Sequence, residues 1–197
     1  LWLKDILPSE LKKYPKIMER VKNVREFLLS CPSPDTNHYA DKPTFPVRLR
    51  YYSEDRINPA LALPKVSSQN RRYIPMEVID ADVIAGSKLF LIPDISLYHF
   101  GVLTSNVHMA WMRAVCGRLK SDYRYSANIV YNNFPWPDAT DAQKAKIEQT
   151  AQGILDARAL YPDSSLADLY DELTMPPELR KAHQKNDQAV LAAYGIK

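Results

Sequence analysis

Two short segments of the sequence concentrate cationic and small polar side chains of the kinds that bind nucleic acids. The first, 65–72, contains three cations and four short polar residues: Lys65, Ser67, Ser68, Gln69, Asn70, Arg71 and Arg72. The second, 118–126, follows an alternating pattern, and its polar members are Arg118, Lys120, Ser121, Asp122, Arg124 and Ser126. Arginine can form paired hydrogen bonds with guanine, asparagine or glutamine can do so with adenine, and serine binds phosphate or either base. We therefore predict that these residues form one DNA-binding surface.

Both segments also have a simpler interpretation that involves no ligand. The first could be a solvated hairpin loop, and the second a charged outer strand face with internal Lys–Asp–Arg pairing. The distribution of charge favours a polyanionic partner. Residues 138–197 carry seven Lys/Arg against ten Asp/Glu, whereas residues 1–137 carry nineteen against thirteen. A basic body of this kind is compatible with nucleic acid.

No other chemistry is marked by a motif. The sequence has no phosphate-binding loop, no dinucleotide fingerprint and no zinc-ligand spacing. The four histidines are scattered along the chain: His38, His99, His108 and His183. We expect each of them to have a structural or solvent role. We predict no catalytic residue and no metal ligand in this sequence.

The segment Asn133-Phe134-Pro135-Trp136 resembles the Asn-Pro-Pro-aromatic motif of amino-methyltransferases, in which the asparagine binds the target amino group and the aromatic ring stacks on a flipped base. Here Phe134 replaces the first proline. Nothing upstream resembles the glycine-rich loop that binds S-adenosylmethionine. We therefore predict an exit turn in which Phe134 and Trp136 pack at the junction with the C-terminal tail.

The polar segments must be positioned by a small sheet. Residues 73–79 read as an edge strand because Pro75 lacks an N–H donor, and 88–92 read as a buried strand because the run is continuously apolar. The alternation over 118–126 predicts one strand with Arg118, Lys120 and Arg124 on the same face. The proline-rich region 31–65 is predicted to be loop, with a short strand near 47–52.

Helices surround this sheet in the prediction. An apolar stripe of Val107, Ala110, Trp111, Ala114 and Val115 predicts a helix capped by Thr104 or Ser105 and ended by Gly117. A further helix is predicted over 10–30. In the tail, Thr140 and Gln143 match a capping box before a helix with an apolar stripe, Ser165 begins a short helix, and Pro177 begins the last one, which ends at Gly195.

The chain has 197 residues, of which 46% are hydrophobic and 25% charged, which is typical of a globular protein. No apolar run approaches the roughly 18 residues of a membrane-spanning helix, so no membrane partner is predicted. Two cysteines 85 residues apart favour a reducing cytoplasm over secretion. The sequence begins with Leu1 rather than Met, so we expect it to be a piece of a longer polypeptide.

The distinctive part of the sequence is FGVLTSNVHMAWMRAVCGRLKSDYRYS at 100–126, followed by NNFPWP at 132–137. Further matches in order are PKVSS at 64–68, RRYIP at 71–75, LTMPPEL at 173–179 and AYG at 193–195. Together these segments resemble the C-terminal part of the large single-chain bacterial DNA methyltransferases of the MmeI and YeeA type. The resemblance extends over essentially the whole chain.

This resemblance implies a restriction–modification protein that methylates the N6 of adenine, sometimes with an attached nuclease. The catalytic motif and the S-adenosylmethionine site of such enzymes lie N-terminal to the region seen here. We therefore expect no cofactor and no methylation by this fragment alone, and two partners: double-stranded DNA and the missing N-terminal methyltransferase domain of the same chain. The expected location is the bacterial cytoplasm.

The combined prediction is an α+β protein with a small mixed β-sheet, packed helices and a helical C-terminal segment. Residues 1–39 form a helical segment and linker, 40–137 the target-recognition domain and 138–197 the C-terminal helical segment. The main alternative is an assembly module that packs on the methyltransferase domain and hardly touches DNA. It predicts that the tail helices cover the Arg118, Lys120 and Arg124 face. An RNA-binding module would instead expose stacking aromatic residues on a sheet face.

Overall fold

The computed structural model describes residues 3, 6–40, 58–83 and 85–196, which fall into two compact units, 1–55 and 56–197. The predicted strand near 47–52 lies outside the described residues. The first unit contains α1 (Pro8–Leu11), α2 (Pro15–Ser30) and α3 (Pro34–Ala40). Pro15 is the first residue of α2, where its missing N–H leaves no hydrogen bond unmade. The apolar stripe of α2 contributes no buried residue.

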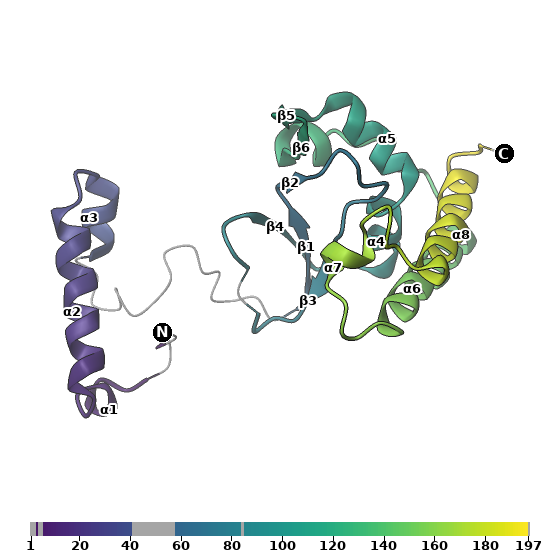
Figure 1. Ribbon diagram of the computed structural model, residues 1–197. Helices are drawn as coiled ribbons and strands as arrows, with labels where there is room; N and C mark the ends of the chain where they lie inside the picture. The colour runs from purple at the N-terminus through teal and green to yellow at the C-terminus, as the bar shows by residue number, and fades with distance from the viewer. Residues whose placement is uncertain (1–2, 4–5, 41–57, 84, 197) are drawn as a thin grey trace. The chain divides into compact units, whose positions relative to one another are not determined.

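The second unit contains two three-stranded antiparallel sheets, which confirms the α+β class (Figure 1). The first sheet has the order β3-β1-β4, with β1 at Ala60–Pro64, β3 at Glu77–Ile79 and β4 at Leu89–Pro93. The edge position of β3 agrees with the prediction. The strand predicted at 88–92 is present as β4, but its predicted burial is wrong, because β4 is the other edge and its residues are half-buried or exposed. The buried central strand is β1. The prediction of loop over 31–65 is wrong for both β1 and α3, which lie inside that region.

The second sheet has the order β2-β6-β5, with β2 at Val66–Ser67, β5 at Gly117–Leu119 and β6 at Asp122–Arg124. The single strand predicted over 118–126 is therefore wrong, since the segment folds into a hairpin. Lys120 makes the turn, with a φ of 55°. Apolar and polar residues alternate along each arm of the hairpin as they would along one strand. The sequence pattern is therefore compatible with both a single strand and a hairpin.

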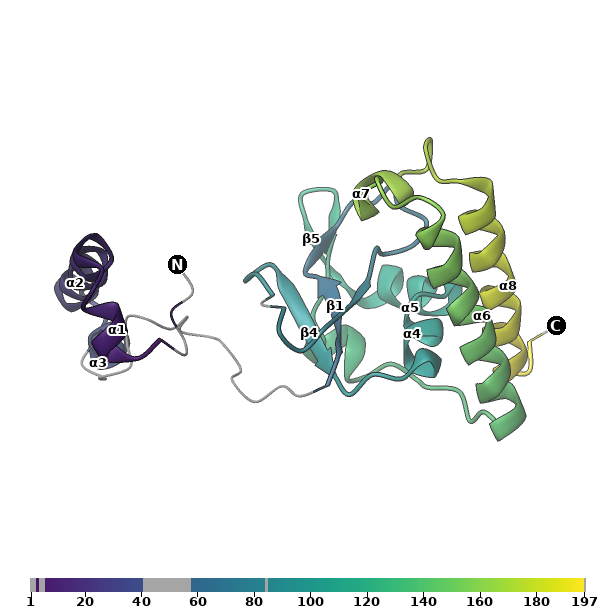
Figure 2. The ribbon, with the colours of Figure 1, turned by 90° about the horizontal axis from the view of Figure 1, so that it is seen from below.

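Helices α4 (Leu97–Leu103) and α5 (Asn106–Val115) lie between the sheets and the antiparallel pair α6 (Asp141–Ala159) and α8 (Pro177–Ala193) (Figures 1 and 2). Gly101 brings α4 close to that pair. A Cβ at this position would lie 2.6 Å from Cγ2 of Ile147 and 3.0 Å from Oδ1 of Asn186. The absence of a side chain at Gly101 therefore allows the helices to approach closely.

Helix α5 begins as predicted but presents a different face to the core. Ser105 is its N-cap, and the Ser105 side chain accepts a hydrogen bond from the N–H of His108. The buried residues are His108, Met109 and Met112, whereas the predicted stripe is half-buried or exposed. Gly117 does not adopt the predicted left-handed conformation; it begins β5.

The tail follows its local sequence signals. The capping box of Thr140 and Gln143 is present at the start of α6, and Ser165 caps α7 (Leu166–Leu169) through a second capping box. Gly195 follows α8 with a φ of 72°. The main hydrophobic core combines residues from both sides of residue 138, among them Leu61, Phe100, Ile154 and Leu179. In the part of the chain described, no helix is both long and apolar enough to cross a bilayer.

Candidate nucleic-acid interface

The two polar segments meet in the second sheet. Strand β2 belongs to the segment 65–72, and strand β6 belongs to 118–126. They pair antiparallel, with Val66 opposite Arg124 and Ser67 opposite Tyr123. A backbone hydrogen bond from Tyr125 N to the carbonyl of Lys65, at 2.9 Å, extends the contact. Two segments about fifty residues apart in sequence thus form one continuous structure.

The hairpin divides the predicted cations between its two faces. Residues directly opposite each other in paired strands share a face. Arg118 is opposite Tyr123, and its guanidinium lies over that ring at 4.0 Å from the centroid. Arg124 is opposite Gly117 and Val66, on the other face. The predicted common face of Arg118, Lys120 and Arg124 is therefore wrong, because each arm of the hairpin alternates by itself and the pairing places Arg118 on the face of Tyr123 instead of Arg124.

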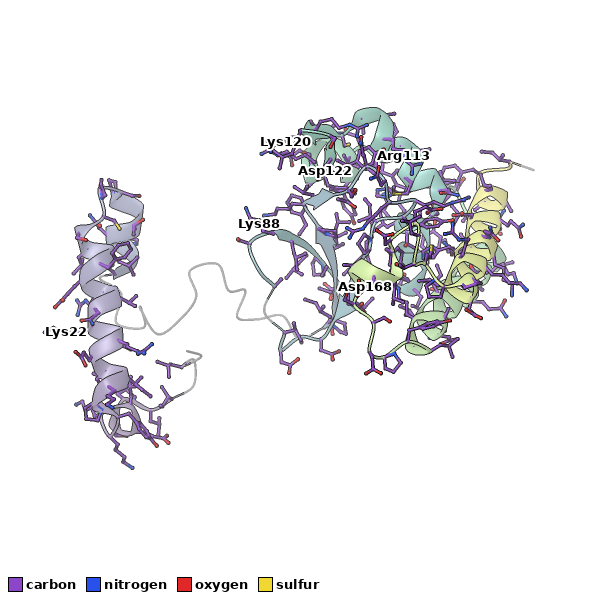
Figure 3. All side chains as sticks on the ribbon, viewed as in Figure 1. Lys22, Lys88, Arg113, Lys120, Asp122 and Asp168 are labelled. Atoms are coloured by element: carbon purple, nitrogen blue, oxygen red, sulfur yellow. The ribbon has the colours of Figure 1, made fainter. Side chains whose placement is uncertain are left out.

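The hairpin turn carries exposed polar groups. Lys120, Ser121 and Arg124 are exposed, and Asp122 is half-exposed. Figure 3 labels Lys120 and Asp122 at this end of the second unit. Among the residues that the structure describes, Asp122 forms no ion pair with Lys120 or Arg124. The internal Lys–Asp–Arg pairing considered as an alternative is thus not formed, and these groups are available to a ligand.

Other predicted site residues serve the fold. Ser67 is only 4% exposed, so its hydroxyl is not on the surface. The amine of Lys65 donates to the carbonyl of Ser87 at 2.8 Å and lies over the Phe90 ring. The hydroxyl of Ser68 accepts from the N–H of Asn70 at 3.3 Å, within the loop. Ser126 caps the π-helical turn Ala127–Tyr131.

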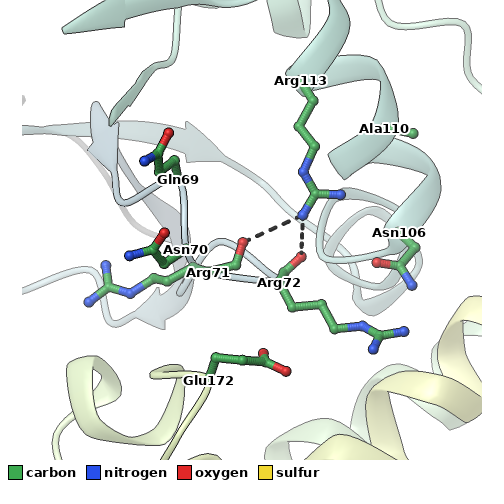
Figure 4. Close-up of a pocket in the computed structure, with 8 residues that line it drawn as sticks. All are labelled: Gln69, Asn70, Arg71, Arg72, Asn106, Ala110, Arg113 and Glu172. Atoms are coloured by element: carbon green, nitrogen blue, oxygen red, sulfur yellow. Dashed lines mark hydrogen bonds between the residues drawn. The ribbon is translucent and has the colours of Figure 1, made fainter. Parts of the chain in front are cut away.

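The loop after β2 and helix α5 line a shallow concavity of about 520 Å³ that is open to solvent (Figure 4). Its lining is Gln69, Asn70, Arg71, Arg72, Asn106, Ala110, Arg113 and Glu172. Arg113 donates from Nη2 to the carbonyls of Arg71 and Arg72, at 3.5 and 3.3 Å. The sequence prediction included four of these residues but missed Arg113 and Asn106. A signal was present, because Arg113 is the only Lys or Arg in α5.

A buried carboxylate holds the two walls of this concavity together. Asp187 of α8 accepts hydrogen bonds from the hydroxyl of Tyr73 and from both the backbone N and Nδ2 of Asn106, each at 2.7 Å. Tyr73 directly follows Arg72 in the loop, and Asn106 is the first residue of α5. Burial raises the pKa of Asp187, and the hydrogen bonds from Asn106 and Tyr73 oppose this effect.

A second buried network joins the same loop to the tail. Arg158 of α6 donates to the carbonyl of Met76 at 2.8 Å and from Nε to the hydroxyl of Tyr170 at 2.9 Å. That hydroxyl contacts Nε2 of His183 at 2.7 Å, and the His183 ring stacks on Tyr73 with centroids 4.1 Å apart. Burial lowers the pKa of His183 well below its usual value, with a further contribution from the Arg158 charge, so the imidazole is neutral.

The aromatic residues of the sheet belong to the core. Tyr123 and Tyr125 are 7% and 4% exposed, and the Tyr125 hydroxyl contacts Nε2 of His108 at 3.0 Å. They offer no stacking platform for unpaired bases, which argues against the RNA-binding alternative.

The segment that resembles a methyltransferase motif is an exit turn, as predicted. Phe134 packs with Ile147 and Val190 in a second apolar cluster, with Trp136 against it. The side-chain amide of Asn133 donates to the carbonyls of Asn128 and Ile129, at 2.6 and 3.2 Å. These side chains are therefore engaged in packing and local hydrogen bonds.

Comparison with known proteins decides the family. The model of the MmeI target recognition domain matches residues 1–138, and the model of the MmeI C-terminal domain matches residues 139–197. The chain belongs to the MmeI family. The MmeI-type resemblance noted in the sequence is thus confirmed, and the chain comprises the target-recognition region with the C-terminal region.

Two relatives support this assignment. The MmeI-family chain is 39% identical over 194 residues to DNA methyltransferase A of Bacillus subtilis (strain 168), and the match covers 98% of this chain and 22% of the relative. It is also similar to a solved structure of MmeI, a Type IIL restriction-modification enzyme, in complex with DNA. That match has a TM-score of 0.89 and 43% identity, and it covers all of this chain and 26% of MmeI. The chain thus spans about a quarter of the length of these relatives.

Proposed function

We propose that the chain reads a short sequence in double-stranded DNA on behalf of a larger adenine-N6 methyltransferase of a restriction–modification system. The observation that carries the proposal is the pairing of β2 with β6, which joins both polar segments in one sheet. The similar MmeI structure contains DNA, and the relative from Bacillus subtilis is named a DNA methyltransferase. Both names support a DNA-directed role for this chain.

The hairpin β5–β6 has a shape suited to base recognition. The major groove of B-DNA admits a two-stranded β-ribbon, and each base pair presents a distinct pattern of donors and acceptors there. In our proposal the turn residues Lys120, Ser121 and Asp122 enter the groove. Lysine can donate to guanine, and a carboxylate can accept from the amino group of cytosine. Arg124, on the hairpin, and Arg71, in the loop after β2, can contact phosphates or guanine.

The assembly alternative is less well supported. It requires the tail helices to cover the hairpin, but α6 and α8 pack on α4 and α5 instead, and Lys120 and Arg124 are exposed. The tail contributes to recognition indirectly, since Asp187 and Arg158 hold the loop that follows β2.

The methyl transfer itself is assigned to a different part of the larger protein. S-adenosylmethionine would supply the methyl group there. The residues described here do not fit a site for it, because Asn133 and Phe134 are committed to local hydrogen bonds and packing. We place the larger enzyme in the bacterial cytoplasm, where its DNA substrate is found.

The proposal can be tested by selecting duplexes from a random pool with the 197-residue chain, followed by fluorescence anisotropy at about 50 and about 200 mM salt. We expect enrichment of one short sequence and binding that weakens steeply with salt. Lys120→Ala and Arg124→Ala should weaken binding, while Lys185→Ala on the outer side of α8 should not. A pool without enrichment, or binding that is equal in all three variants, would favour the assembly module.

A further inference from the structure

The concavity beside the hairpin has an excess of positive charge. Arg71, Arg72 and Arg113 line it, and the only carboxylate in its lining is Glu172. That carboxylate is already neutralised, since its Oε1 lies 2.7 Å from Nη1 of Arg180. Arg72 interacts with the buried Asp187 carboxylate and with the hydroxyl of Tyr73. Arg71 and Arg113 form no ion pair among the described residues, so the lining keeps an excess of positive charge.

The arginine concavity is held in shape without a ligand. Arg113 spans the gap from α5 to the loop by donating to two of its carbonyls. Behind this contact, the Asp187 carboxylate binds the loop through Tyr73 and α5 through Asn106. Such preorganisation lowers the entropic cost of binding, because the walls need not be ordered when the ligand arrives.

From this geometry we propose that the arginine concavity binds a backbone phosphate of the DNA, with Arg72 and Arg113 as its ligands. Guanidinium groups match the geometry of phosphate oxygens and form charge-assisted hydrogen bonds with them. The N-terminal end of α5 contributes little, because the backbone N–H of Asn106 is donated to Asp187. The arginine side chains therefore carry the interaction.

The arginine concavity adjoins side chains that can contact bases. Gln69 and Asn70, which can contact base edges, belong to the same loop as Arg72. Contacts to phosphate fix the register of a protein on the duplex, and contacts to bases specify the sequence. A phosphate held by Arg72 and Arg113 would set how deeply this loop and the neighbouring hairpin approach the groove. This inference rests on the proposed function, since it assumes that the chain binds DNA.

The test uses the 197-residue chain and its selected duplex, in which each phosphate in turn is replaced by a neutral methylphosphonate. For the unmodified protein, one replacement or two adjacent ones should weaken binding by at least about tenfold. Arg72→Gln and Arg113→Gln should be insensitive to that same replacement. Loss of one phosphate contact should also reduce the affinity ratio between about 50 and about 200 mM salt by roughly 3.5-fold.

Two variants serve as controls. Arg124→Gln, on the hairpin, should keep the sensitivity to that replacement, and Lys185→Gln should behave as the unmodified protein. The free energy of unfolding of Arg72→Gln is measured alongside binding, since the Arg72 guanidinium also interacts with the hydroxyl of Tyr73 and with the Asp187 carboxylate. Unchanged binding in Arg72→Gln and Arg113→Gln, or weakened binding with no dependence on any single phosphate, overturns the inference while leaving DNA recognition intact. Absence of DNA binding by the unmodified chain overturns both.

Discussion

Replacement of Asp187 tests whether α8 fixes the position of the loop after β2. In Asp187→Ala, the hydroxyl of Tyr73 and the backbone N–H of Asn106 lose their acceptor at 2.7 Å in a buried place. An unsatisfied buried donor costs about 1–3 kcal/mol, so the free energy of unfolding should fall by roughly 3–4 kcal/mol. The side-chain amide of Asn106 can turn to water and adds little. Asp187→Asn keeps one acceptor oxygen and should cost only about 1–2 kcal/mol.

A double-mutant cycle separates this contact from general damage. Tyr73→Phe alone should cost about 1 kcal/mol, because it leaves a buried carboxylate with one donor fewer. In the Asp187→Ala background the same change should cost nothing or stabilise, so the coupling energy should be about 1–2 kcal/mol. Urea unfolding followed by circular dichroism measures all four proteins. A coupling energy below about 0.3 kcal/mol would refute the reasoning, because it would mean that Tyr73 and Asp187 act independently.

Three further changes test other parts of the fold. Gly101→Ala places a methyl 2.6 Å from Cγ2 of Ile147 and should lower the free energy of unfolding in urea by about 1–3 kcal/mol. Gly153→Ala, with open space around it, should be neutral or stabilising. Equal effects of the two changes would contradict the close approach of α4 to α6. Trp111→Ala removes a core contact and a 2.9 Å hydrogen bond from Nε1, so we expect a loss of about 3 kcal/mol, and a thermal midpoint within about a degree of the original would count against it. Burial lowers the pKa of His108 to about 4, so as the pH falls below about 6.5 the unfolded chain binds a proton at this residue before the folded chain does. The free energy of unfolding should therefore fall by about 3 kcal/mol between neutral pH and pH 4. An equal fall in His108→Gln would show that His108 is not its cause.

The parts of the fold that follow local rules could be predicted from the sequence. Thr140 with Gln143, Ser165 and Gly195 mark the ends of the tail helices, because capping is decided by side chains within a few residues. The buried face of α6 includes Ile147, Ala151 and Ile154, which have the spacing expected of the apolar stripe of this helix. These signals need no knowledge of distant partners.

The parts that depend on distant partners could not be predicted. Strand β1 could not be recognised because Ala60–Pro64 is short, follows Pro59, ends in a proline and has no alternation of apolar and polar residues. It is buried because it is the central strand, with β3 on one side and β4 on the other. The turn at Lys120 has no sequence mark, since a lysine with positive φ is uncommon. Helix α5 packs on more than one element, so its periodicity did not show that Met109 and Met112 face the core.

The candidate site shows the same division. Residue types alone drew attention to both polar segments. A common sheet was predicted for them, but the structure separates their sheet, β2-β6-β5, from the sheet of β3 and β4. Which side chains stay on the surface depends on packing, so Ser67 was included although it is buried. Arg113 was missed because its contact with the loop joins residues about forty positions apart.

Residues from both family regions share the core, and this limits which segments can be exchanged between related proteins. The boundary at 138 between the two family regions crosses one continuous core and two buried polar networks, since Asn186 donates to the Gly101 carbonyl at 2.7 Å and Arg158 donates to Met76. A chimaera that imported only residues 1–138 from a relative would place foreign partners against Asp187, Asn186 and Arg158. If the proposed DNA recognition holds, the unit that must be exchanged to transfer it is larger than residues 1–138, and recombinants that fold should carry both regions from the same parent.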